Sequence, residues 1–363
     1  SKALGDAVVA YAKNIDKLES LLPVVKRIAH KHVSVGVEQH HYPIVGETLL
    51  EAIADVLDLS NNHPAIIAWA EAYNLLANIF ISTESSVRKA NAERQHGWVG
   101  FKKFKIHHIE RETPLIKSFY LLPRDGSSVP SFSAGQYIGV KVNTEGSKYT
   151  QIRQYSLSKK WAFRITIKAD IEDSNYIQMR QYSLSKRWGF RITVKAEPQG
   201  LASNFLHDCV KGDSVYVQSP TGVFTLSGSP RRKIFIAGGV GATPLMCMLH
   251  EAAEKSIDPS DILFIQCVNG SSDRVFHNEL LNLRSKFDYH YKLCVEEADV
   301  GDHRGRLNQE ILTHWMNELN FHGENSEVYL CGPTPFMSGL KQMLLQSGFA
   351  DDHLHYEVFG PRA

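Results

Sequence analysis

The feature that most constrains this chain of 363 residues is a tandem repeat near its middle. Residues 147–173 are followed at once by residues 174–200, and 17 of the 27 aligned positions are identical. Each copy carries Arg-Gln-Tyr-Ser and then an alternating segment, Phe-Arg-Ile-Thr, that predicts a β-strand. Arginine offers a rigid donor fork for phosphate, tyrosine a ring face and serine a short hydrogen bond. The repeat therefore indicates a site for a planar, phosphate-bearing cofactor such as a flavin.

Composition narrows the class of protein. The length predicts two or three domains, and 43% hydrophobic and 22% charged residues are typical of globular proteins. A net charge of +1 argues against nucleic acid and anionic membrane surfaces as partners. Apolar runs such as residues 75–81 are too short to span a bilayer. Five scattered cysteines without metal-type spacing favour a reducing, cytoplasmic location.

The hydrophobic period changes twice along the chain. Apolar spacings of three and four predict helices over residues 5–14, 16–32, 42–57 and 64–92 within a first domain, 1–94. Residues 98–228 switch to period two, which predicts an antiparallel β-barrel interrupted by one helix at 201–210. Residues 230–363 alternate strand and helix, which predicts a doubly wound α/β domain.

Two glycine-containing turns follow predicted strands of the last domain. The first has the residues Gly239, Val240, Gly241, Ala242, Thr243 and Pro244. Glycines there let the backbone approach a pyrophosphate, and the helix N-terminus favours its charge. The second turn has Cys331, Gly332 and Pro333, and ligands bind at this carboxyl edge of parallel sheets. We therefore expect a dinucleotide site formed by both turns.

The order of these motifs resembles the ferredoxin reductase-like family. The ending His-Tyr-Glu-Val-Phe-Gly-Pro (355–361) is similar to that of its flavohaemoglobin branch, the flavohaemoproteins. The resemblance implies FAD in the barrel and NADH or NADPH on the α/β domain. It also implies flavin contacts from Tyr137, Gly200 and Ser203, and from the C-terminal residues Glu357, Val358, Phe359, Gly360 and Pro361.

Which copy of the repeat holds FAD is open. The second copy runs directly into Gly200, so we expect contacts from Arg180, Gln181, Tyr182 and Ser183, with residues 147–173 extruded or added at an edge. The alternative site is Arg153, Tyr155 and Ser156 of the first copy, and a third possibility is that both compete.

The helical domain resembles the rear part of a globin. His32 extends the apolar face of Leu18, Leu21, Val25 and Ile28, and His30 points away from it. The resemblance makes His32 the axial ligand of haem b iron, with Tyr42 and Glu84 as its supporting network. Glu84 shares a stripe with Ile66, Tyr73 and Phe80 among others, so its carboxylate should face the interior.

These assignments predict an NAD(P)H-dependent oxidoreductase that converts nitric oxide and dioxygen to nitrate. The resemblance further implies that the chain is N-terminally truncated relative to the family, without the distal haem residues. Two alternatives remain, a haem-less NAD(P)H:flavin-type oxidoreductase and a non-functional product. The choice between NADH and NADPH stays open, because only Arg274 is placed to meet a 2′-phosphate.

Overall fold

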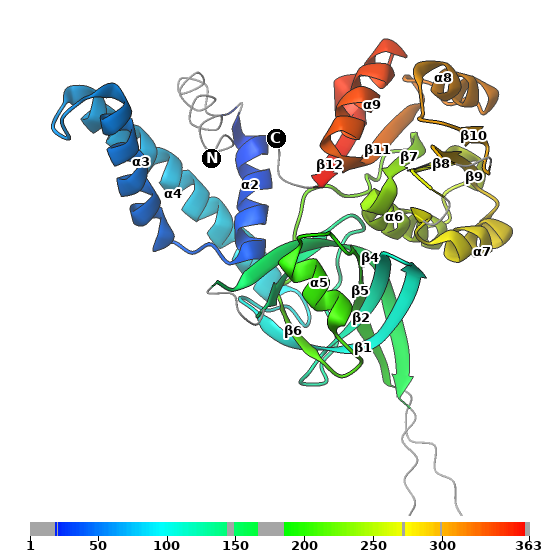
Figure 1. The fold of residues 1–363 in the computed structure, drawn as a ribbon, viewed down its shortest axis with the longest axis horizontal. Helices are drawn as coiled ribbons and strands as arrows, with labels where there is room; N and C mark the ends of the chain where they lie inside the picture. The colour runs from blue at the N-terminus through cyan, green and yellow to red at the C-terminus, as the bar shows by residue number, and fades with distance from the viewer. Residues whose placement is uncertain are drawn as a thin grey trace, which may run out of the picture.

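The computed structural model describes residues 19, 21–143, 149–165, 185–270, 273–297 and 300–359. Figure 1 shows three parts: a group of helices, a barrel beneath them and an α/β part beside both. The helix predicted over residues 5–14 lies outside the described residues.

Three helices form the first part: α2 Leu22–Val35, α3 His41–Leu57 and α4 Pro64–Glu93. Helix α2 ends at Gly36, whose left-handed backbone (φ 79°) lets its N–H bond to the last carbonyls of the helix. Helix α4 begins at Pro64 after His63, whose ring accepts the N–H of Ala65 at 3.2 Å. The predicted stop and restart between α3 and α4 is confirmed.

Helix α4 is long and apolar enough, by length and composition alone, to cross a membrane. One such helix is weak evidence, because a helix of a globular protein passes the same test. In this fold α4 packs on α2 and α3 and carries the fully buried carboxylate of Glu84.

The second part is a closed antiparallel barrel with the strand order β1-β2-β5-β4-β3-β6. Its strands are β1 Lys102–Thr113, β2 Ile116–Pro123, β3 Tyr137–Val142, β4 Gln151–Ile165, β5 Ser185–Lys195 and β6 Ser214–Val217. Helix α5, Leu201–Asp208, packs beside it, and aromatic and aliphatic side chains such as Phe104, Phe119 and Phe190 fill the interior. The predicted barrel is confirmed.

Each copy of the repeat contributes one strand to this barrel. β4 comes from the first copy and pairs with β3, whereas β5 comes from the second copy and pairs with β2. The expectation that the first copy is extruded or edge-added is therefore wrong. Beyond Lys160, β4 and β5 continue as a two-stranded extension in which Trp161 faces Gly189 and Ile165 faces Ser185. The extension forms because the two segments can still exchange backbone hydrogen bonds where no third strand reaches them.

The third part is a parallel sheet with the order β10-β9-β8-β7-β11-β12, as predicted for a doubly wound domain. Its strands are β7 Arg232–Gly238, β8 Ile262–Val268, β9 His290–Val295, β10 His303–Arg304, β11 Ser326–Pro333 and β12 Leu354–Phe359. Helices α6 Ala242–Glu254 and α7 His277–Phe287 pack on one face. Helices α8 Gln309–Glu318 and α9 Thr334–Gln346 pack on the other. On β7, the side chain of Phe235 packs with helices α6 and α7, and those of Ile234 and Ile236 pack with helices α8 and α9.

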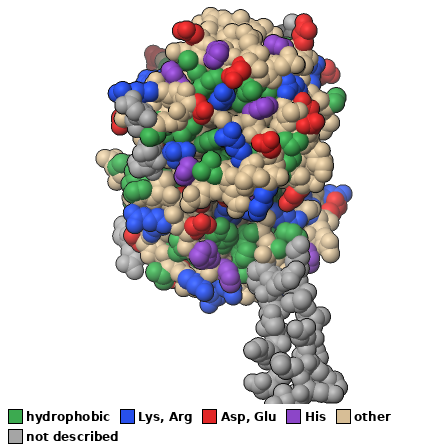
Figure 2. All heavy atoms as spheres, turned by 90° about the vertical axis from the view of Figure 1, so that its right-hand side faces the viewer, with side chains coloured by type: hydrophobic (Ala, Val, Ile, Leu, Met, Phe, Trp, Pro, Cys, Tyr) green, Lys and Arg blue, Asp and Glu red, His purple; other side chains and the backbone are tan. Residues whose placement is uncertain are grey.

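Figure 2 shows the α/β side of the molecule, where acidic and basic side chains are interspersed. The mixture of both signs of charge on this face agrees with the small net charge of the chain, +1.

Candidate functional site

His32, Tyr42 and Glu84 come together between the three helices. His32 Nδ1 lies 2.8 Å from Glu84 Oε1 and 3.3 Å from the Tyr42 hydroxyl. Tyr42 donates to the same Glu84 oxygen at 2.5 Å, and Tyr73 donates to the Tyr42 carbonyl at 2.6 Å. Positions 32, 42 and 84 lie on α2, α3 and α4, so packing of all three helices sets the imidazole orientation.

Glu84 is fully buried, as its place on the apolar stripe of α4 predicts. A buried carboxylate is costly unless it is hydrogen-bonded, and here its other oxygen also meets Arg88 at 3.5 Å. Burial and the hydrogen bond to Glu84 raise the pKa of Tyr42 far above its ordinary range. Tyr42 therefore stays protonated and remains a donor to Glu84.

The arrangement around His32 fits an axial ligand of haem iron. Because Nδ1 is engaged by Glu84, the opposite ring nitrogen, Nε2, is the one left for a metal. One third of the His32 side chain is exposed, and the ring of Phe80 lies 5.5 Å away. A carboxylate held on Nδ1 is the usual partner of a metal-bound histidine.

Next to helix α2, the first copy of the repeat forms a second cluster of candidate site residues. β4 sets Ser156 opposite Tyr137 of β3, and Tyr155 opposite Ile138. Burial raises the pKa of Tyr155 to about 12. Among the described residues, the exposed guanidinium of Arg153 donates only to the Ile152 carbonyl and the Gln151 amide oxygen. The residues Arg180, Gln181, Tyr182 and Ser183, preferred from the sequence, lie outside the described residues.

Gly200 and Ser203 shape the start of α5. Ser203 Oγ donates to the Gly200 carbonyl at 3.0 Å and accepts from the Glu197 N–H at 3.2 Å. A Cβ on Gly200 would lie 2.3 Å from Ser203 Oγ, so a larger residue there would displace the Ser203 side chain.

The two glycine-containing turns of the α/β domain meet, as the sequence predicts. Residues 239–241 form a single 3-10 turn before α6, and the Thr243 hydroxyl donates to the Val240 carbonyl at 3.0 Å. A Cβ on Gly241 would lie 2.2 Å from the Cys331 carbonyl oxygen. Burial, followed by the charge of Glu357, raises the pKa of the Cys331 thiol well above its ordinary value. The thiol is therefore neutral and unsuited to act as a nucleophile.

The last strand lies beside these turns and also reaches α2. β12 sets Glu357 opposite Cys331 and Val358 opposite Gly332. The buried Glu357 carboxylate pairs with Lys31 Nζ at 3.0 Å, and Lys31 directly precedes His32. Phe359 lies opposite Pro333, whereas Gly360 and Pro361 lie outside the described residues.

Further contacts between α2 and the barrel were not predicted from the sequence. Gln154 Nε2 donates to Ser34 Oγ at 2.6 Å, and Gly139 leaves room for the Ser34 carbonyl, which a Cβ would approach to 1.7 Å. His30 points away from the His32 network, as expected, and accepts the Gly222 N–H at 3.1 Å. Burial, with Lys26 and Arg94, lowers the pKa of His30 to about 4, so this acceptor is neutral at pH 7. A single sequence carries no periodic signal for such contacts.

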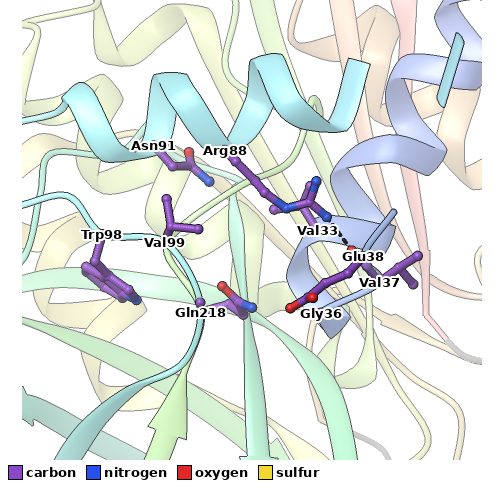
Figure 3. Close-up of a pocket in the computed structure, with 10 residues that line it drawn as sticks. Val33, Gly36, Val37, Glu38, Arg88, Asn91, Trp98, Val99 and Gln218 are labelled. Atoms are coloured by element: carbon purple, nitrogen blue, oxygen red, sulfur yellow. Dashed lines mark hydrogen bonds between the residues drawn. The ribbon is translucent and has the colours of Figure 1, made fainter. Parts of the chain in front are cut away.

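Figure 3 shows a pocket at the same junction, between the end of α2, the end of α4 and the barrel. Arg88 extends into it from α4 and donates to the Val37 carbonyl, with Trp98 and Gln218 across the pocket. Its volume of about 40 Å³ suffices for a few waters. This pocket is therefore too small for a cofactor.

Arg274 follows β8 at the carboxyl edge of the sheet. Its Nε is buried with no hydrogen-bond partner among the described residues. An unpaired buried donor at the nucleotide edge suits an anionic ligand group.

Fold and site together define a class: a helical part with a histidine network joined to a two-domain oxidoreductase of the ferredoxin reductase type. A family model for globins matches residues 1–80, and one for the oxidoreductase NAD-binding domain matches residues 235–342. The flavohaemoprotein of Halalkalibacterium halodurans is 36% identical over 99% of this chain and 84% of its own. That of Bacillus subtilis is also 36% identical, with the same coverage. The chain belongs to the flavohaemoprotein family.

Solved structures agree with this assignment. A flavohaemoglobin from Malassezia yamatoensis with bound FAD and haem has a TM-score of 0.79, at 23% identity, over 99% of this chain and 85% of that one. The FAD/NAD-binding domain of a nitric oxide dioxygenase from Vibrio cholerae has a TM-score of 0.59, at 31% identity. It covers 72% of this chain and 99% of that one. These findings confirm the predicted architecture and FAD, haem and NAD(P)H as the cofactors of the family.

Proposed function

We propose that this flavohaemoprotein uses NAD(P)H to oxidise nitric oxide to nitrate with dioxygen. The observation that carries the proposal is the His32–Glu84–Tyr42 network on a helix whose neighbouring residue, Lys31, pairs with Glu357 of the last strand. One helix thus connects a metal-ligand site with the flavin side of the reductase. The bound cofactors would supply hydride acceptance, single-electron transfer and oxygen chemistry.

In this proposal the chain's residues position and tune those cofactors. Glu84 accepts the hydrogen bond from the His32 Nδ1 proton and thereby makes the imidazole a stronger electron donor. Removal of such a carboxylate partner generally weakens a metal site. Tyr42 keeps Glu84 in place by donating to the same oxygen. Residues 239–244 and 331–333 would bind NAD(P)H.

We further propose that the first copy of the repeat holds FAD. The guanidinium of Arg153 is exposed and makes only local hydrogen bonds within the described residues, which suits exchange for a phosphate, and Tyr155 and Ser156 lie beside Tyr137 on the adjacent strand. Gly200 and Ser203 would hold the pyrophosphate, with Glu357, Val358, Phe359, Gly360 and Pro361 at the flavin ring. The register of β3 and β4 favours this copy over Arg180, Tyr182 and Ser183.

The proposed setting is the cytoplasm, with small molecules as partners and no nucleic acid. All five cysteines are free, as expected in a reducing compartment. The second candidate function is a haem-less NAD(P)H:flavin-type oxidoreductase.

The test is an anaerobic absorbance spectrum before and after NADH, followed by nitric oxide consumption in air. We expect a Soret band and flavin bands that NADH reduces, and a Soret band lost in His32→Ala but kept in His40→Ala. His40 is a suitable control because it is an exposed histidine between α2 and α3. Flavin bands alone would leave the reductase and overturn the dioxygenase proposal. No visible absorbance would overturn both.

A further inference from the structure

Arg191 is buried at the junction between the barrel and the α/β domain. It lies on β5, is 2% exposed, and donates through Nη1 to Glu279 Oε2 of α7 at 2.5 Å. Its Nε donates to Ser158 Oγ at 2.9 Å and its Nη2 to the Ser158 carbonyl at 3.3 Å. One side chain thus binds both β4 and the neighbouring domain.

Glu279 accepts from three cationic or polar donors. Besides Arg191, Lys159 Nζ of β4 and His250 Nε2 of α6 each lie 2.7 Å from its Oε1. Burial alone would raise the pKa of Glu279, but the hydrogen bond from His250 and the charges of Arg191 and Lys159 hold it well below its ordinary value. The carboxylate is therefore ionised and joins two strands of the barrel to two helices of the α/β domain.

An aromatic ring completes the contact. The Arg191 guanidinium lies 4.8 Å from the ring centroid of Phe276, the residue before α7. Phe276 is buried with a left-handed backbone, φ 59°, which is costly for a non-glycine residue and persists only when its surroundings hold it. A cation over a ring in a desolvated site adds attraction between the domains.

The cluster lies close in sequence to both proposed cofactor sites. Ser158 and Lys159 follow Tyr155 and Ser156 on β4, and α6, which carries His250, starts at the glycine turn of residues 239–241. A shift of Glu279 relative to Arg191 therefore changes the separation of the nucleotide turn from the flavin side of the barrel.

We infer that Arg191 and Glu279 are positioning residues that hold the nucleotide-binding domain against the barrel in the orientation required for hydride transfer. The inference rests on the proposed use of NAD(P)H and FAD. Opening of the junction leaves a buried arginine and a carboxylate without their partners, which is strongly unfavourable. Reaction rates are sensitive to displacements of about 1 Å between reacting groups, so a loosened junction should slow the chemical step.

The test compares Glu279→Gln with the wild-type chain in stopped-flow bleaching of the flavin by NADH. The substitution keeps the shape of the side chain and removes its charge. We expect the limiting rate at saturating NADH to fall about tenfold or more, which corresponds to about 1.4 kcal/mol. The FAD content and the apparent NADH dissociation constant should stay within about twofold, since neither site is altered. Glu279→Asp should restore part of the rate.

Glu296→Gln is the matched control, because Glu296 pairs with Arg306 at the surface of the same domain. We expect it to bleach at the wild-type rate.

A second measurement does not depend on activity. The radius of gyration from small-angle scattering should rise in Glu279→Gln and stay at the wild-type value in Glu296→Gln. If wild-type flavin is not bleached by NADH, the proposed function fails, and scattering alone decides the inference. An unchanged limiting rate together with an unchanged radius of gyration would overturn it.

Discussion

The two copies of the repeat have nearly the same sequence but different places in the structure. The Arg-Gln-Tyr-Ser segment of the first copy, residues 153–156, lies in β4 between β3 and β5. The Phe-Arg-Ile-Thr segment of the second copy, residues 190–193, lies in β5 against β2. The barrel is thus completed by one half of each copy.

One sequence difference explains part of this choice. Gly189 of the second copy corresponds to Ala162 of the first. A Cβ on Gly189 would lie 2.6 Å from the Leu121 carbonyl oxygen and 2.8 Å from Trp161. An alanine in that place would overlap with a backbone atom of β2, so the first copy is unfavourable as β5.

The largest expected difference between the copies is in the arginine of the Phe-Arg-Ile-Thr segment, Arg164 in the first copy and Arg191 in the second. Arg191→Met removes a buried donor and leaves Glu279 short of a partner, so we expect the free energy of unfolding to fall by about 3–5 kcal/mol. Arg164→Met changes the corresponding residue on the two-stranded extension and should cost less than about 0.5 kcal/mol. Urea unfolding measures both. Equal losses would contradict the assignment of β5 to the second copy.

A smaller difference in stability is expected from substitutions at Gly189 and at the corresponding Ala162. Gly189→Ala should destabilise the chain by about 1–3 kcal/mol, because the added methyl group meets the Leu121 carbonyl. Ala162→Gly, the matched change in the first copy, should cost about 0.5–1 kcal/mol through backbone entropy alone. Thermal unfolding of the two variants tests this ranking. A Gly189→Ala chain as stable as the parent would show that the close approach is absent.

The glutamines of the repeat should differ by less. Gln154 Nε2 bonds to Ser34 Oγ at 2.6 Å and to the Lys31 carbonyl at 3.3 Å, which ties the first copy to α2. Gln154→Ala should therefore lower the free energy of unfolding by about 1 kcal/mol. We predict that Gln181→Ala has no measurable effect in the same urea titration. The reverse ranking would place the second copy next to α2.

The smallest effect is predicted for removal of one repeat length. Deleting residues 161–187 joins Lys160 to Trp188 and leaves one continuous Arg-Gln-Tyr-Ser…Phe-Arg-Ile-Thr hairpin. Loop-closure cost depends weakly on length, at about 0.6 kcal/mol per doubling, so stability should change by less than about 1 kcal/mol. Calorimetry of the shortened chain, with its FAD content as a second readout, checks this. A shortened chain that loses FAD would show that the extension supports the site.

Much of the fold follows from local pattern. The start of α4 at Pro64, the glycine turn after β7 and the doubly wound α/β part were all predicted, because each has a period, a cap or a turn residue in the sequence. His32, Tyr42 and Glu84 could be named in advance because a family resemblance fixes their spacing.

The choice between copies could not be predicted, because it depends on which segments reach their neighbours in space. Residues 153–156 and 180–183 are identical, so no propensity distinguishes them. Because the second copy runs directly into Gly200, we expected the first copy to be extruded or added at an edge, and this expectation is wrong. The Arg191–Glu279 pair joins residues 88 positions apart across two domains. A single sequence does not encode such a pairing in any period or motif.

The central claim is that the first copy of the repeat holds FAD, and titration of the apoprotein with FAD tests it most directly in Arg153→Ala and Arg180→Ala. A charge-assisted hydrogen bond contributes about 1.5–3 kcal/mol, so Arg153→Ala should weaken FAD binding about tenfold or more. Arg180→Ala should leave the dissociation constant at the parent value. Weakened binding in Arg180→Ala with unchanged binding in Arg153→Ala would contradict the account and assign the flavin to the second copy.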